Sequence, residues 1–422
     1  MAAATAVLLC WCCGYIPPSL FSPMPDSVLR PHIWCWVVLR TLCYTTSAAL
    51  HISLAGRRCE LRVRYLRPIL LKGHERAITC VLYNNDGDLV FTAAKDQMPT
   101  LWYAKTGERI GTYQGHQGAV WDLTVSWDSS RMVSASADAS ARMWDVQTGR
   151  ELVVYNHMGP LRSASFAEGG QRFATVSDPF TDSPGHVSVF ETPSDVPVDQ
   201  LEKIASLEID LPPKMKATKV VWGALNEKLI VSYADGTLRT FDPLDGSELQ
   251  YAQVRRERVG GGEQVHSKDI NRLTLNKDRT LLLTCSKDHT AKLLDADTLQ
   301  VLKVYKTDRP VNAAVMHPTK EHVILGGGQD AMSVTTTSSN VGKFESRFFH
   351  MIYEEEFGRV KGHFGPINAL AINPNGLSYA SGAEDGYVRL HFFDEDYLSK
   401  QDEVPDELEE PVHKEAGGYD DN

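Results

Sequence analysis

Cysteine is scarce in most of this 422-residue chain, and this limits the classes of protein to which it can belong. Beyond residue 66 only Cys80 and Cys285 occur. Two cysteines so far apart do not form the disulfide framework of a secreted domain, so we expect a protein of a reducing compartment. The absence of an Asn-x-Ser/Thr glycosylation site agrees with a cytoplasmic protein.

Long hydrophobic runs are also lacking. The apolar stretch 2–16 resembles the core of a signal peptide, but no basic residue precedes it and Pro17-Pro18 end it. It is too short to span a bilayer. We interpret residues 1–65 as a poorly ordered extension; the sequence leaves open whether they are a targeting segment or the product of an incorrect gene model.

Positive charge is in deficit, with 43 Lys and Arg against 54 Asp and Glu, and the net charge is −11. Residues 1–66 hold six Arg against Asp26 and Glu60, so the acidic excess lies in the remainder. An acidic body repels phosphate, so tight direct binding of nucleic acid is not expected. The acidic end of the chain, 397–422, is predicted to be disordered.

Sequence motifs for catalysis, metals and cofactors are missing as well. The run GGGQD at Gly326 lacks the Gly-Lys-Ser/Thr of a phosphate loop, and no G-x-G-x-x-G or G-x-S-x-G occurs. His350, His363 and His391 lack metal-ligand spacing. We predict no enzyme, no metal and no cofactor.

What the chain does contain is a repeat with a fixed internal distance. A His is followed 22 residues later by an Asp in four places: His74 and Asp96, His116 and Asp138, His266 and Asp288, His363 and Asp385. Trp102 and Trp144 lie six residues past the first two Asp. Such periodic recurrence indicates a repeat architecture.

The repeat divides the body into seven units. Short runs of β-branched and aromatic residues alternate with Gly, Asp and Asn turns, about four runs to a unit. The units begin at or near Gly73, Gly115, His157, Ala217, His266, Arg309 and Gly362. We predict an all-β fold over 66–396, a seven-bladed WD-repeat β-propeller. Because an open last blade would expose a sheet edge, the first strand, near 68–71, is expected to close blade seven.

The recurring polar residues are expected to be structural. In unit two, a chain of hydrogen bonds through His116, Asp138, Ser136 and Trp144 would satisfy every buried polar group. An enzyme needs one reactive set, whereas a scaffold repeats the same set, so repetition favours the structural role over a catalytic triad. The same alignment adds Ser286 in unit five, and places Ala94 and Ala383 at the serine position of units one and seven.

Longer strings identify a resemblance. GHFGPINALAINPNG, LGGGQDAMSVTTT, GKFESRFF, EEEFGRVKGHFGP and RPILLKGHERAIT are similar to the eukaryotic translation initiation factor 3 subunit I family. The resemblance covers 66–398 and leaves 1–65 and the acidic tail as extra segments. Unit three and the loop before unit five match the family poorly.

The resemblance implies a non-catalytic scaffold within the factor 3 complex, binding subunits b and g, reaching the small ribosomal subunit through the complex, and supporting 43S pre-initiation complex assembly and mRNA recruitment. We place the b-subunit site on blades five and six. There Asp278 and Asp295 bracket Leu293 and would receive a basic amphipathic helix. The alternative is that Leu293 is core and both Asp cap turns.

Another functional class stays open, in which the propeller is an adaptor for a receptor kinase or a ubiquitin ligase. Ligase adaptors often carry Trp-Asp-x-Arg at the end of a blade. The nearest match here is the segment 144–147, which ends in Gln147 and lacks the Arg. Ser and Thr are too common to test the kinase role.

Overall fold

The contacts within the chain divide it into two units, Met1–Tyr65 and Leu66–Asn422. The computed structural model describes residues 52–54, 57–59, 67–181, 183–192, 204–212, 215–254, 263–328 and 344–399. In the first unit, β1 (Ile52–Leu54) and β2 (Arg57–Cys59) form an antiparallel pair. The rest of the predicted poorly ordered extension lies outside the described residues, as does 400–422.

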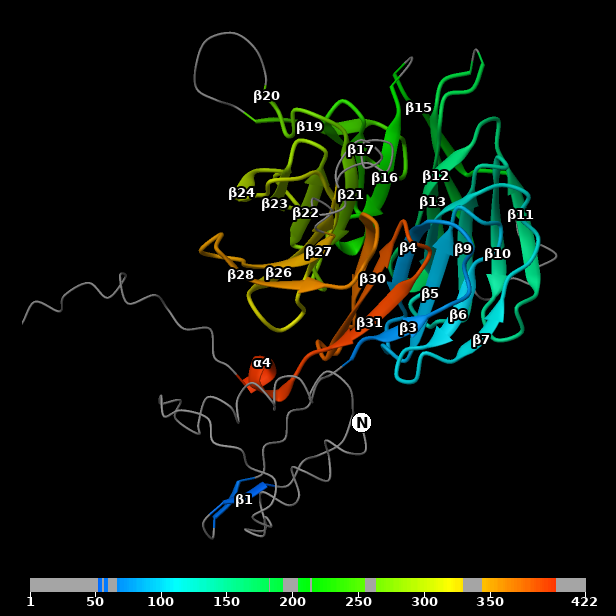
Figure 1. Ribbon diagram of the computed structural model, residues 1–422. Helices are drawn as coiled ribbons and strands as arrows, with labels where there is room; N and C mark the ends of the chain where they lie inside the picture. The colour runs from blue at the N-terminus through cyan, green and yellow to red at the C-terminus, as the bar shows by residue number, and fades with distance from the viewer. Residues whose placement is uncertain are drawn as a thin grey trace, which may run out of the picture. The chain divides into compact units, whose positions relative to one another are not determined.

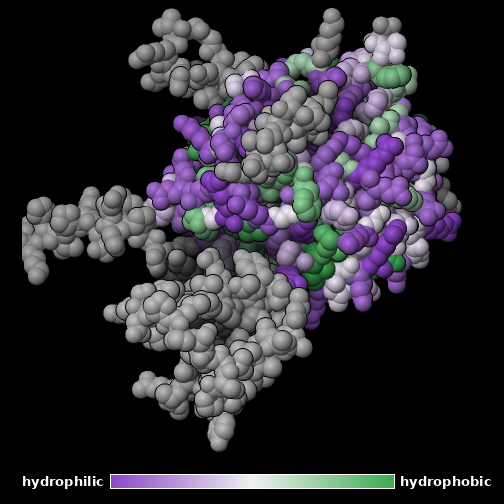
Figure 2. All heavy atoms as spheres, in the orientation of Figure 1, coloured by the Kyte–Doolittle hydropathy of each residue, from purple (hydrophilic) through white to green (hydrophobic). Residues whose placement is uncertain are grey.

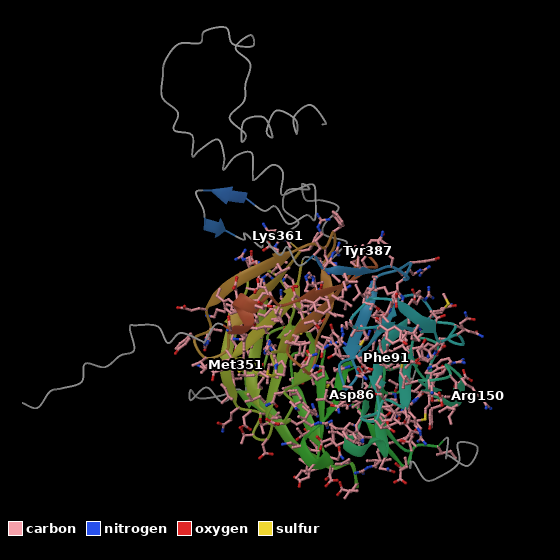
Figure 3. The ribbon with its side chains drawn as sticks, turned by 90° about the horizontal axis from the view of Figure 1, so that it is seen from below. Asp86, Phe91, Arg150, Met351, Lys361 and Tyr387 are labelled. Atoms are coloured by element: carbon pink, nitrogen blue, oxygen red, sulfur yellow. The ribbon has the colours of Figure 1, made fainter. Side chains whose placement is uncertain are left out.

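The second unit contains seven antiparallel sheets, each built from strands that are consecutive in the chain except at the closure. In Figure 3 the sheets follow one another around a ring, from blue through green and yellow to orange. The predicted seven-bladed propeller is confirmed. We call the strands of each blade inner, second, third and outer, starting from the centre of the ring.

The bounds of the strands show how regular the blades are. Blade one has β4 (Ile78–Tyr83), β5 (Leu89–Ala94), β6 (Thr100–Tyr103) and β7 (Arg109–Thr112). Blade two has β8 (Val120–Val125), β9 (Arg131–Ser136), β10 (Ser140–Asp145) and β11 (Glu151–Asn156). Blade three has β12 (Leu161–Phe166), β13 (Arg172–Ser177), β14 (His186–Glu191) and β15 (Leu207–Asp210).

The remaining blades repeat this order. Blade four has β16 (Ala217–Trp222), β17 (Leu229–Tyr233), β18 (Leu238–Phe241), β19 (Glu248–Val254) and a fifth strand, β20 (Glu263–Gln264). Blade five has β21 (Ile270–Leu275), β22 (Leu281–Ser286), β23 (Thr290–Asp295) and β24 (Val301–Lys306). Blade six has β25 (Val311–Met316), β26 (His322–Gly327), β27 (Glu345–His350) and β28 (Glu356–Lys361). Blade seven has β29 (Ile367–Ile372), β30 (Ser378–Ala383), β31 (Val388–Phe392) and β3 (Ile69–Leu71).

The ring closes as predicted, with the first strand of the propeller completing the last blade. Strand β3 pairs antiparallel with β31, and Figure 1 shows the two side by side. Ile69 lies opposite Leu390 and Leu71 opposite Val388. Leu71 is 2% exposed and belongs to a core cluster that joins blade seven to blade one. The two ends of the propeller sequence are therefore held by backbone pairing and by burial.

The core lies between the blades because both faces of each sheet are covered by the neighbouring blades. Clusters of buried side chains join successive blades, such as Tyr155 and Phe173 of blades two and three. Their rings meet edge to face at 5.0 Å. The surface in view in Figure 2 is mostly hydrophilic, with small separate hydrophobic areas. The apolar residues of the strands are thus used mainly to hold blade against blade.

The inner strands share one irregularity that shapes the centre of the ring. In each blade the register between the inner and second strands shifts between the first and third residues of the inner strand. A bulge of this kind adds a residue and re-aims the neighbouring side chains. As a result, the second and third residues of an inner strand can both line the central channel, as Trp121 and Asp122 do in β8 and Asn271 and Arg272 do in β21.

The end of the propeller differs from the prediction. The acidic tail was expected to begin at residue 397, but helix α4 (Glu395–Ser399) includes the first three residues of it. The hydroxyl of Tyr397 lies 2.7 Å from Nδ1 of His322, and its ring stacks on Phe393 at 4.5 Å. Aromatic packing on blade six thus fixes a segment that composition alone marked as disordered.

Candidate functional site: a loop network, a charged channel and the turn face

The propeller has two faces, which its loops define. The network face carries the loops that enter each inner strand and those that join second to third strands. The turn face carries the turns that join inner to second and third to outer strands. Antiparallel order fixes this division, because alternate connections lie at opposite ends of a sheet.

The His and Asp of each predicted pair meet on the network face. His116 Nδ1 lies 2.9 Å from Asp138, and the same contact is 2.7 Å from His74 to Asp96. The other two pairs measure 2.9 Å in blade five and 3.1 Å in blade seven. The 22-residue spacing therefore brings together a loop residue and a residue of the facing loop in four blades.

The hydroxyl that completes the network is not the predicted one. His116 Nε2 lies 2.6 Å from the hydroxyl of Ser134, which also accepts the indole N–H of Trp144 at 2.8 Å. Ser136 is instead bonded locally, since its oxygen accepts the backbone N–H of Asp138 at 3.2 Å. The prediction for Ser136 was wrong because both serines point to the same face of β9, and only Ser134 lies deep enough to meet the imidazole.

The same correction applies in blade five. Ser286 accepts the backbone N–H of Asp288 at 3.1 Å, whereas His266 Nε2 contacts Thr284 at 2.7 Å. Leu294 stands where blade two has its Trp and is fully buried.

Blades one and seven also keep their hydroxyl, so the apparent loss at Ala94 and Ala383 is not a loss of the network. In blade one Thr92 joins His74 at 2.7 Å to Trp102 at 2.9 Å. In blade seven Ser381 contacts His363 at 2.8 Å, and His391 takes the Trp position at 3.2 Å. A Ser or Thr 18 residues after each His is the sequence signal that identifies these hydroxyls.

The electrostatics of the network keep the Asp ionised. Burial acts to raise the pKa of Asp138, but hydrogen bonds from His116, Ser140 and the backbone of Gln117 outweigh it and lower that pKa well below its usual range. An ionised carboxylate only accepts, so the imidazole carries its proton on Nδ1 and accepts the Ser134 hydroxyl at Nε2. Every member of the chain is thereby satisfied, which is a structural arrangement and leaves no free nucleophile.

A second polar cluster lies in the central channel, and no motif in the sequence indicated it. Asp122 of blade two accepts the hydroxyl of Ser163 at 2.8 Å and the N–H of Ala164 at 3.0 Å, both of blade three. Lys219 of blade four forms a short ion pair with the same carboxylate, and Arg272 of blade five lies 3.6 Å from it. Four blades therefore converge on one buried carboxylate.

Arg272 extends this cluster to blade one. Its guanidinium donates to the backbone oxygen of Thr79 at 2.9 Å and lies 2.9 Å from the sulfur of Cys80. Burial acts to raise the pKa of Asp122, but Lys219 and Arg272 outweigh it and lower that pKa. The available signal was a charged residue at the third position of three inner strands, each with no other charged residue. The partners of these residues lie in other blades, so spacing could not reveal them.

The three residues of the predicted partner site do not all lie at the surface. Asp278 is exposed in the turn between β21 and β22, and Asp295 begins the turn between β23 and β24 at the same end of blade five. Leu293, however, is only 3% exposed and packs with Val311 and Phe349 in the core between blades five and six. Of the two expectations for Leu293, the surface anchor is wrong and the core position is confirmed, because on β23 its side chain points between the sheets.

The role of Asp295 is partly local. Its carboxylate accepts the backbone N–H groups of Asp297 and Thr298 at 2.9 and 2.8 Å, which caps the turn. Asp297 pairs with Lys228 of blade four at 2.6 Å. Blade six adjoins through Lys303 and Glu354, 3.7 Å apart, and Ile352 of its β27–β28 turn is 45% exposed. Acidic turns and an exposed apolar side chain thus occur together here.

Two further observations concern the described residues. No group of three or more His, Cys, Asp or Glu side chains is placed to hold a metal ion within them. None of the helices they form is long and apolar enough to cross a membrane.

Comparison with known proteins gives one consistent result. The sequence profile of the EIF3I family matches residues 66–403. Proteins named "Eukaryotic translation initiation factor 3 subunit I" are similar over most of the chain. That of Bombyx mori is 44% identical over 334 residues, covering 79% of this chain and 97% of the relative. Those of Nematostella vectensis and Homo sapiens are 46% and 44% identical over 332 and 333 residues, each covering 79% of this chain and 98% of the relative.

Proposed function

Because this chain belongs to the family of eukaryotic translation initiation factor 3 subunit I, a non-catalytic family of WD-repeat propellers, we propose that it is a scaffold subunit of that factor. In this role it binds the b and g subunits in the cytoplasm and supports assembly of the 43S pre-initiation complex and recruitment of mRNA. The observation that carries the proposal is the match of the whole propeller to nearly full-length relatives.

The propeller suits a scaffold because its buried polar groups bond one another and stabilise the ring. The hydrogen-bond network and the Asp122 cluster serve this purpose, and the exposed turns are available to partners. A basic amphipathic segment of the b subunit would fit the turn face of blades five and six. Asp278 and Asp295 offer carboxylates there, and Ile352 replaces Leu293 as the apolar contact.

The test is co-purification of this chain with the b and g subunits, followed by cosedimentation with small ribosomal subunits. Copurification of both subunits and sedimentation with the small ribosomal subunit are expected. A chain that purifies without them and stays at the top of the gradient would contradict the scaffold role.

The proposed b-subunit surface is tested separately with Asp278→Lys combined with Asp295→Lys. Since Asp295 caps a turn, Asp295→Asn is the matched control, because its amide oxygen retains the cap without the charge. The double reversal should abolish binding of b, whereas Asp278→Lys with Asp295→Asn should weaken it without lowering the melting temperature. Full retention of b by the double reversal would discard this surface and leave the family role intact.

A further inference from the structure

The mouth of the central channel on the network face is a hollow of about 720 Å³ with a charge unlike that of the chain. Six basic side chains line it: Lys95, Arg162, Lys216, Lys219, Arg272 and Lys287. Four acidic ones line it: Asp122, Asp178, Asp269 and Glu384. The hollow therefore carries an excess of two positive charges in a chain whose net charge is −11.

Most of these charges are already paired. Lys95 contacts Glu384 at 3.0 Å and Lys287 contacts Asp269 at 2.7 Å. Lys216, at the start of the inner strand of blade four, is exposed, and its ammonium has no hydrogen bond or ion pair to the residues that the structure describes. It is the charge on this rim that a ligand can engage without breaking an existing pair.

The neighbouring blade contributes a carboxylate that is already paired. Asp178 is 7% exposed and lines the hollow. Its Oδ2 accepts from Arg162 at 2.6 Å, whereas its Oδ1 is buried without a hydrogen-bond partner. Because Oδ1 is buried, it is not open to a ligand, and the ion pair with Arg162 holds this carboxylate in the wall of the hollow.

Exposed apolar side chains flank the same place. Met158 is 74% exposed and Phe180 is 56% exposed, in the two loops of blade three on the network face. The loops touch, since a Cβ added at Gly159 would lie 3.1 Å from Cβ of Phe180. Trp121 adds an aromatic ring under the guanidinium of Arg162, at 4.6 Å. A small inorganic anion would leave these apolar contacts unused.

From these features we propose that the network face of blades three and four is a docking site for an acidic peptide segment of a partner protein. A peptide carboxylate pairs with Lys216, and an apolar peptide side chain packs on Met158 and Phe180. Charge complementarity selects the acidic peptide over a basic one, because the free charge on the rim is a lysine.

The probe is a fluorescein-labelled peptide with the sequence of residues 401–412, QDEVPDELEEPV, in which apolar residues alternate with six acidic ones. Its control, QKKVPKKLKKPV, reverses every charge. Binding is followed by fluorescence anisotropy to the full chain and, because the probe copies the chain's own acidic end, also to a chain that ends at Ser399. Binding of the acidic peptide to both chains supports a separate partner, and binding only to the shortened chain supports the site with the chain's own end as occupant.

Two variants locate the site, and a third is the control. Lys216→Glu should weaken binding at least about tenfold, because it replaces an attraction by a repulsion. Phe180→Ser should weaken it about three- to tenfold by removing apolar contact. Lys72→Glu is the matched control, since Lys72 is exposed at the entry to blade one, and the change should alter binding by less than about twofold.

Absence of binding to both chains, equal binding of the two peptides, or an effect of Lys72→Glu as large as that of Lys216→Glu would each overturn the proposal. Because all three substituted side chains are exposed, unchanged melting curves are expected, and a variant with a lowered melting temperature is replaced by Met158→Ser.

Discussion

The network of blade two yields a prediction that separates two neighbouring serines. Ser134 is fully buried and joins His116 to Trp144, whereas Ser136 accepts only one backbone N–H at 3.2 Å. Ser134→Ala removes the acceptor of a buried indole N–H and the donor to a buried imidazole nitrogen. Each such group costs about 1–3 kcal/mol when unsatisfied, so we expect a loss of about 2–4 kcal/mol. Ser136→Ala should cost no more than about 1 kcal/mol.

The assay is the shift of the urea midpoint followed by near-ultraviolet circular dichroism, since tertiary packing around Trp144 is what the substitution disturbs. Ser134→Thr provides the matched control. Blades one and five use Thr92 and Thr284 at this position, so the hydroxyl is retained and the loss should stay below about 1.5 kcal/mol. If Ser136→Ala destabilises the protein as much as Ser134→Ala, the assignment of the hydroxyl is refuted.

Three further predictions concern stability. Asp138→Ala should cost about 2–4 kcal/mol in urea unfolding, because it leaves buried His116 without its acceptor; a change within error would refute the buried network. A chain truncated through residue 72 loses β3 and the buried Leu71 and should melt well below one truncated through residue 60, whereas equal melting temperatures would contradict closure by β3. Burial lowers the pKa of His157 to about 4, so the stability that its neutral form contributes is present above pH 6.5 and is lost as the pH falls toward 4. The free energy of unfolding should fall by about 2 kcal/mol between pH 7.5 and 5. This fall should be absent in His157→Gln, and an unchanged pH dependence in that variant would count against the assignment.

The two serines of β9 show what residue spacing cannot predict, namely which hydroxyl contacts the His116 imidazole. Ser134 and Ser136 are two residues apart on β9, so they share a face and satisfy the same sequence pattern. Register decides between them, because it places Ser134 opposite Arg142 within β9 and Ser136 at the end of β9, opposite Val120. The His and Asp could be assigned from the sequence because a fixed strand length separates them in every unit.

The partner surface was only partly accessible from sequence for a similar reason. Asp278 lies in a turn and Asp295 ends β23 where the next turn begins. Because turns are exposed, their position at the surface follows from composition. Leu293 and the next residue, Leu294, are both buried, so β23 does not alternate between apolar and polar residues there. Alternation therefore did not reveal where the Leu293 side chain points. Packing against blade six decided it.

The sequence by itself determined the architecture, the number of blades and the closing strand, because repeated units of about four short strands can bury their apolar faces only against copies of themselves. The tertiary structure alone decided which side chains meet across the channel. Asp122, Lys219 and Arg272 lie 97 and 53 residues apart along the chain, and only closure of the ring brings the three charges together. Contacts between residues so far apart in the sequence depend on how the blades are arranged around the axis of the ring, and no local sequence pattern specifies that arrangement.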